Sequence, residues 1–169
     1  LPALKDRASS GGLGEGRVVR GGLGMGDVER LNKTLAAEHA ALYAYGLVAA
    51  RVTGAVRARM AAAFEAHRAR RDQLRSMIAA RGGKPVETEA SYRLPATPST
   101  AGQAIAVAAQ VEDGVAAAYL ELVAADDAEL RRYAALAVQE AVTRAYGLRR
   151  RVEAFPGLAG VLPTPTTTG

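Results

Sequence analysis

The strongest constraint on this chain is a set of four long segments in which apolar residues recur at steps of three and four. That spacing is typical of helices with one buried face. No segment alternates apolar and polar residues with a period of two, so strands are not expected. The sequence therefore predicts an all-α protein. Its four helical segments are about residues 27–53, 55–81, 99–125 and 126–155.

The connections between these segments differ in length. The first and second segments meet at Gly54, and the third and fourth meet near Asp126, so each pair should form an antiparallel hairpin. Residues 84–98 contain three prolines, which exclude a regular helix. We therefore expect a four-helix bundle of two antiparallel hairpins joined by a long proline-containing crossover. A bundle with short loops throughout is the alternative, and the prolines argue against it.

The chain has three parts by composition. Residues 1–26 are rich in glycine and lack apolar periodicity, so this segment is predicted to be disordered. Residues 27–158 hold the helical bundle, and 169 residues are enough for one domain with a real core. Residues 159–169 are a Pro/Thr tail that we expect to be flexible.

Each predicted core-facing stripe carries one ionisable residue near its middle. A buried carboxylate is costly unless it is paired, protonated or bound to a metal. Three carboxylates and an imidazole that meet at one depth are a candidate site for one iron, manganese or zinc ion. In the fourth helix this stripe is read as Tyr133, Ala137, Glu140 and Arg144. The four candidate ligands are Glu38, His67, Glu112 and Glu140.

A weak internal repeat supports this convergence. Tyr45 follows Glu38 by seven residues, and Tyr119 follows Glu112 by seven. Seven residues are about two helical turns, so each Glu and its Tyr share a face. The two hairpins are therefore interpreted as diverged copies related by a pseudo-twofold axis.

These strings resemble a known superfamily. Ala37-Glu38-His39-Ala40 through Tyr45-Gly46, and Ala66-His67-Arg68-Ala69-Arg70-Arg71-Asp72, are similar to a small actinobacterial ferritin-like family without an assigned function. Di-iron members of the ferritin-like superfamily carry Glu on helices 1 and 3 and Glu-x-x-His on helices 2 and 4. The resemblance covers about residues 27–155. It implies a ferritin-like bundle in which metal chemistry is an open question.

The departures from the di-iron pattern reduce the expected ligand set. Phe64 stands where the second helix should carry Glu, and Thr143 stands where the fourth should carry His. A full di-iron centre is therefore not expected. What the resemblance leaves is a mononuclear site of Glu38, His67 and Glu140, with Glu112 as a fourth ligand or as a hydrogen-bond partner.

A metal-free polar network is the favoured alternative. Arginines lie within about one turn of these acids and can neutralise them, and the tyrosines can donate further hydrogen bonds. Under this hypothesis the chain is a dimeric scaffold or interaction protein with a degenerate centre. Enzymatic activity is left undecided. The residues assigned to ion pairs or support of the centre are Arg68, Arg71, Arg144, Tyr45 and Tyr119.

Composition restricts the partners. The chain has no Cys, so disulfides and thiolate metal sites are excluded. No stretch is long and apolar enough to span a membrane and no secretory signal is recognised, so we expect a cytoplasmic protein without a membrane partner. The net charge of +5 comes without the aromatic residues or motif of a nucleic-acid binder, so nucleic acid is not an expected partner.

A homodimer is expected because alanine-rich helices bury little area per residue. Leu42, Tyr43, Leu47 and Met77 supply apolar surface beyond a single core stripe, so the first two helices are the predicted dimer face. The identity of any protein partner is left open.

Overall fold

A computed structural model describes residues 26–149 of the chain. This part contains four α-helices, one short 3₁₀ turn and no strand, which confirms the predicted all-α bundle. None of its helices is long and apolar enough to cross a membrane. The predicted disordered segment, the C-terminal tail and the end of the bundle at residue 158 lie outside the described residues. The elements are α1 (Asp27–Val48), η1 (Ala49–Arg51), α2 (Gly54–Ala80), α3 (Ala101–Leu122) and α4 (Ala128–Arg149).

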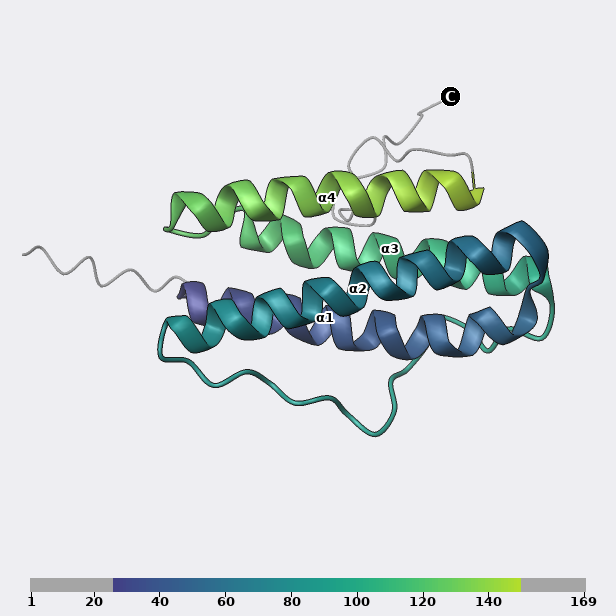
Figure 1. Cartoon of the computed structure of the whole chain (residues 1–169), viewed down its shortest axis with the longest axis horizontal. Helices are drawn as coiled ribbons and strands as arrows, with labels where there is room; N and C mark the ends of the chain where they lie inside the picture. Colours follow the sequence, from purple (N-terminus) through teal and green to yellow (C-terminus); the bar gives the residue numbers. More distant parts are fainter. Residues whose placement is uncertain (1–25, 150–169) are drawn as a thin grey trace, which may run out of the picture.

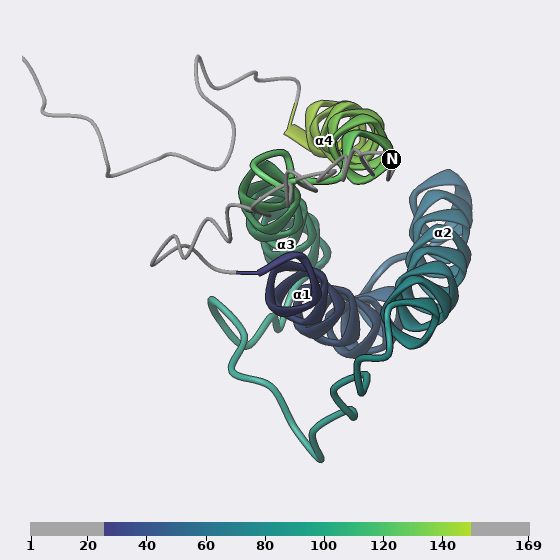
Figure 2. The same cartoon turned by 90° about the vertical axis from the view of Figure 1, so that its left-hand side faces the viewer.

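The four helices are arranged as two antiparallel hairpins. Figure 1 shows α1 and α4 running in one direction and α2 and α3 in the other, with the α2–α3 connection crossing the length of the molecule. The helix α1 packs against α2 and α3, and α3 packs against α4. The end-on view shows that α2 and α4 flank the remaining side of the bundle without close backbone packing (Figure 2).

Helix ends are fixed by local hydrogen bonds. Thr100 and Gln103 form a capping box at the start of α3, which satisfies backbone N–H groups that a helix leaves unpaired there. The Asp27 carboxylate accepts hydrogen bonds from the backbone N–H groups of Asp126 and Asp127, at 2.8 and 3.0 Å. The start of the first hairpin is thereby tied to the turn of the second.

The apolar core has two clusters separated along the bundle. One contains Leu35 and Leu74, and the other contains Val48 and Met60. On α2 and α3, the buried residues His67 and Glu112 fall between the two clusters in the sequence, and both contact the buried Glu38 on α1 or its partners. The bundle therefore holds a polar layer at mid-height, between two apolar layers.

The inward face of α4 differs from the predicted stripe. Tyr133, Glu140 and Arg144 were expected in the core, but alanines occupy most of the inward face. Glu140 is exposed, whereas Tyr133 and Arg144 are half-buried at the edge of the core. Alanine allows α4 to approach α3 closely, so the close contact selects the small residues for the interface. The buried residues of α4 are Leu130, Ala134, Ala137, Ala141 and Ala145.

The crossover covers part of the expected dimer face. The ring of Tyr43 lies 5.6 Å from that of Tyr92 in the crossover, and Met77 packs against the core. His39, adjacent to Glu38, is buried with Nε2 3.3 Å from the Val86 carbonyl oxygen of the crossover. Of the apolar residues assigned to the dimer face, Leu47 alone is exposed, at 43%.

Candidate functional site

The centre of the bundle is an imidazole held between two carboxylates. His67 Nδ1 lies 2.7 Å from Glu38 Oε2, and His67 Nε2 lies 3.1 Å from Glu112 Oε1. All three side chains are fully buried. An ionised carboxylate can only accept hydrogen bonds, so a ring with carboxylates at both nitrogens must carry a proton on each. The geometry is that of an imidazolium between two carboxylates.

The electrostatics of His67 agree with this geometry. Burial by itself lowers the pKa of His67, but hydrogen bonds to Glu112 and Glu38 and their negative charges outweigh it and raise the pKa to about 9. Burial acts in the opposite direction on Glu112, yet the hydrogen bonds and charges of His67 and Arg144 hold its pKa below the usual value. The charged forms of both groups are therefore favoured at neutral pH.

Two tyrosines complete the layer in a reciprocal pattern. Tyr45 on α1 donates to Glu112 Oε1 on α3 at 2.6 Å, and Tyr119 on α3 donates to Glu38 Oε1 on α1 at 2.7 Å. Each hairpin therefore supplies a phenol to the carboxylate of the other. Burial, and then the charge of the neighbouring carboxylate, raise the pKa of Tyr45 and of Tyr119 well above the usual value, so both phenols keep their protons.

Arg144 brings a second positive charge to the centre. Its Nε donates to Glu112 Oε1 at 2.8 Å from α4. Burial alone lowers the pKa of Arg144, but the charge and hydrogen bond of Glu112 raise it above its ordinary value. Two carboxylates, one imidazolium and one guanidinium sum to zero, so the buried layer is charge-balanced by protein groups alone.

One oxygen of the layer has no donor. Glu112 Oε1 accepts hydrogen bonds from Tyr45, His67 and Arg144, whereas no donor among the described residues reaches Glu112 Oε2. Residues 26–149 also contain no group of three His, Cys, Asp or Glu side chains arranged to hold a metal ion. The candidate ligands that do meet are bound to one another instead of facing a common centre.

Glu140, the fourth candidate ligand, is not part of this layer. Its side chain is 49% exposed and its Oε2 lies 2.7 Å from Arg70 Nη2 on α2. Because alanines take the inward position on α4, Glu140 is turned toward the α2–α4 side. The guanidinium of Arg70 also lies over the ring of Tyr133, 4.7 Å from its centroid.

Of the arginines assigned to the centre, only Arg144 reaches it. Arg68 is exposed and lies 3.5 Å from Glu65 Oε2, and Arg71 pairs with the neighbouring Asp72 at 2.7 Å. Arg70, which was not assigned to any partner, is the residue on α2 that pairs with Glu140 on α4. The sequence has arginine at positions 68, 70 and 71, and nothing in it distinguishes Arg70 from the other two. Which of these arginines faces α4 depends on how α2 is rotated about its axis.

The two positions that depart from the di-iron pattern supply no ligand. Phe64 is half-buried and packs against the cluster that contains Met60. Thr143 is exposed and donates to the Gln139 carbonyl within its own helix. Neither side chain substitutes for the missing carboxylate or imidazole.

Comparisons with known proteins agree with the fold. A family model described as a domain of unknown function (DUF4439) matches residues 30–160. A conserved hypothetical protein from Mycobacterium tuberculosis, rv2844, is 35% identical, with a TM-score of 0.71 over 73% of this chain and 95% of that one. A ferritin-like, diiron-carboxylate protein from Bacillus anthracis shares the fold at 20% identity, with a TM-score of 0.63 over 73% and 93% of the two chains. No curated protein matches the sequence.

Proposed function

Because this chain belongs to the DUF4439 family and has a ferritin-like fold, we propose that it is a metal-independent member of that fold which acts as a binding scaffold. The observation that carries the proposal is the charge-balanced layer of Glu38, His67, Glu112 and Arg144. In this layer the positive charges of His67 and Arg144 neutralise the carboxylates, as metal ions do in a di-iron centre.

The residues do not fit a bound metal ion. Iron, manganese and zinc bind carboxylates and neutral imidazole, so a ligating nitrogen of His67 must first lose its proton. Both ring nitrogens face carboxylates, and three of the four oxygens of Glu38 and Glu112 already accept hydrogen bonds. Only Glu112 Oε2 lacks a donor, and one oxygen is too few ligands for a stable site. A mononuclear metal site remains the alternative that the following experiment tests.

Metal analysis distinguishes the two proposals. We expect protein purified without chelator or affinity metal to contain far less than one iron, manganese or zinc ion per chain, and to remain so after incubation with each ion. Elemental mass spectrometry gives the measurement. Near-stoichiometric metal that is lost in Glu112→Gln and retained in Glu140→Gln would contradict the proposal and support a site at the buried layer.

We further propose that the protein is a homodimer in the cytoplasm. Small side chains limit the area that each helix buries, and large apolar side chains stay exposed on two helices: Leu47 on α1, and Leu136 and Tyr146 on α4. Light scattering at several protein concentrations is expected to give twice the mass of one chain. A single-chain mass at every concentration would reject the dimer and leave the metal-independent centre unaffected.

A further inference from the structure

The side of the bundle between α2 and α4 is bridged by long polar side chains. Arg70 pairs with Glu140, Tyr133 donates to Gln73 at 3.2 Å, and Arg59 Nη1 donates to the Gly147 carbonyl at 3.3 Å. Bridges of this length hold two helices apart without filling the space between them. A cavity of about 320 Å³ lies between α2 and α4, toward the end of the bundle where Arg59 and Gly147 meet. This volume is at the lower end of the range for small-molecule sites.

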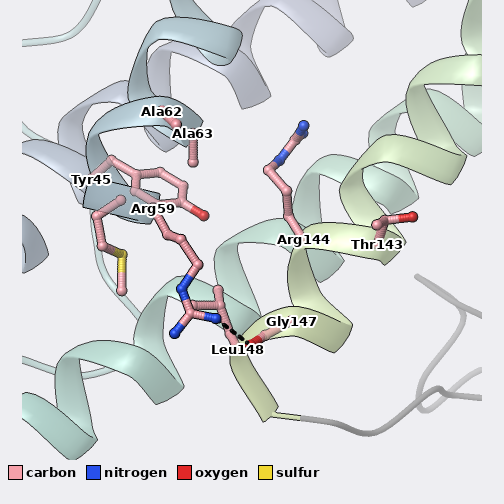
Figure 3. A pocket seen from close by; sticks show the side chains of 9 residues that line it. Tyr45, Arg59, Ala62, Ala63, Thr143, Arg144, Gly147 and Leu148 are labelled. Carbon is pink, nitrogen blue, oxygen red and sulfur yellow. Dashed lines mark hydrogen bonds between the residues drawn. The ribbon is translucent and has the colours of Figure 1, made fainter. Parts of the chain in front are cut away.

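The cavity has an apolar floor and a basic rim. Met60, Ala63 and the ring of Tyr45 are buried and form the floor, where the Tyr45 hydroxyl also donates to Glu112. Figure 3 shows Arg59 crossing from α2 toward the Gly147 carbonyl, with Arg144 on the α4 side. The described residues that line the cavity include these two arginines and no carboxylate.

The two arginines differ in how their charge is compensated. Arg144 donates through Nε to Glu112, so its charge is matched inside the layer while its side chain stays 22% exposed. Arg59 is exposed, and among residues 26–149 its bonded partner is a backbone carbonyl and not an acid. The rim therefore carries one uncompensated positive charge. A ligand with a single negative charge balances it, whereas a phosphate monoester brings more charge than the rim can match.

We propose that this cavity binds a small monocarboxylic acid with an apolar tail. The carboxylate pairs with the guanidinium of Arg59, because guanidinium and carboxylate match in geometry and charge. The tail lies over Met60 and Ala63, where burial removes apolar surface from water. The inference rests on the proposed function in one respect: Glu112 binds Arg144 and no metal ion.

Titration of octanoate into the isotope-labelled full chain tests the proposal. We expect shifts of the amide signals of Ala62, Ala63 and Gly147, with a dissociation constant below about 1 mM. Acetate, which lacks the tail, and octanol, which lacks the charge, are expected to bind at least about tenfold more weakly. Absence of saturable binding by octanoate, or equal binding of octanol, would overturn the proposal.

Matched variants locate the site. Arg59→Gln is expected to weaken octanoate binding about tenfold through loss of the charged hydrogen bond. Arg57→Gln removes the same charge two residues away on α2, outside the cavity, and is expected to leave binding unchanged. Ala62→Phe, at an exposed lining position, fills the cavity and should abolish binding in a protein whose thermal unfolding remains cooperative. Equal weakening by Arg57→Gln and Arg59→Gln would reject the assigned site.

Metal content measured on the same samples separates this inference from the proposed function. Octanoate binding with no metal present supports both. Bound metal at the layer contradicts the proposed function. If Arg59→Gln still weakens octanoate binding by that metal-loaded protein about tenfold, the cavity assignment stands by itself.

Discussion

His67→Gln is expected to lower the free energy of unfolding by about 4 kcal/mol, since removing one member of a buried ion pair leaves an uncompensated charge. Glutamine keeps a similar size and can donate to one carboxylate, but it cannot carry charge or serve Glu38 and Glu112 from both sides at once. The layer then holds two carboxylates against one guanidinium. Chemical denaturation at neutral pH, followed by circular dichroism, measures the change.

The other histidine of the chain provides the matched control. His39 is also buried, yet it has one long hydrogen bond to the Val86 carbonyl and lies outside the layer. His39→Gln is therefore expected to cost about 1 kcal/mol or less, the usual net value of a neutral hydrogen bond. Equal losses in the two variants would mean that His67 is a neutral core residue and that the layer is not an ion-pair network.

The second large expected effect is a loss of stability as the pH rises from about 6.5 to about 9. The pKa of His67 is about 9 in the folded protein and 6.5 ordinarily, so the folded state binds the proton more tightly. A group whose pKa is raised by folding stabilises the protein fully below its unfolded pKa, and this contribution disappears as the pH passes the folded pKa. The shift corresponds to on the order of 3 kcal/mol.

The comparison of wild type with His67→Gln isolates this contribution. Denaturation at a series of pH values should show the alkaline decline in the wild type and in His39→Gln, and its absence in His67→Gln. Measurements should stay below pH 10, the ordinary pKa of tyrosine, because Tyr45 and Tyr119 resist ionisation only in the folded state. A wild-type stability that is flat between pH 6.5 and 9 would contradict a charged His67.

At acidic pH, the stability of the protein depends on Glu112 and His39 instead of His67. The folded pKa of Glu112 is lowered, so its contribution is present above the ordinary value of 4.5 and is lost as the pH falls through the folded value. The folded pKa of His39 is lowered mainly by burial, so the unfolded chain gains a proton more readily below pH 6.5. Both groups reduce stability on acidification, which places the stability maximum near neutral pH.

Local sequence was sufficient to predict the helices and the central residues of the layer. Gly54 and Gly82 stand at the two ends of α2, and the prolines of residues 84–98 precede α3, because the backbone limits of these residues act without tertiary contacts. Glu38, His67 and Glu112 were found because each interrupts a stripe of larger apolar residues. Tyr45 and Tyr119 also lie in the layer, because two turns of one helix place each of them on the same face as the Glu seven residues before it.

Helix α4 shows where such reasoning fails. Alanine occupies both core and surface positions of a helix, so an alanine-rich segment does not define which face points inward. Tyr133 and Glu140 had the spacing of a buried stripe, but close packing of α3 and α4 placed Ala134 and Ala141 inside. One step along a helix turns a side chain by about 100°, which separates the exposed Glu140 from the buried Ala141. Arg144 reaches Glu112 because its side chain is long.

By itself, the sequence determined that four helices form in two hairpins and that ionisable residues sit midway along them, because periodicity and chain breakers are local properties. Only the tertiary structure decided which charges meet. The rotation of each helix about its axis, set by packing against its neighbours, gave Glu112 to Arg144 and Glu140 to Arg70. The same packing left α2 and α4 apart, and the cavity beside Arg59 lies between these two helices.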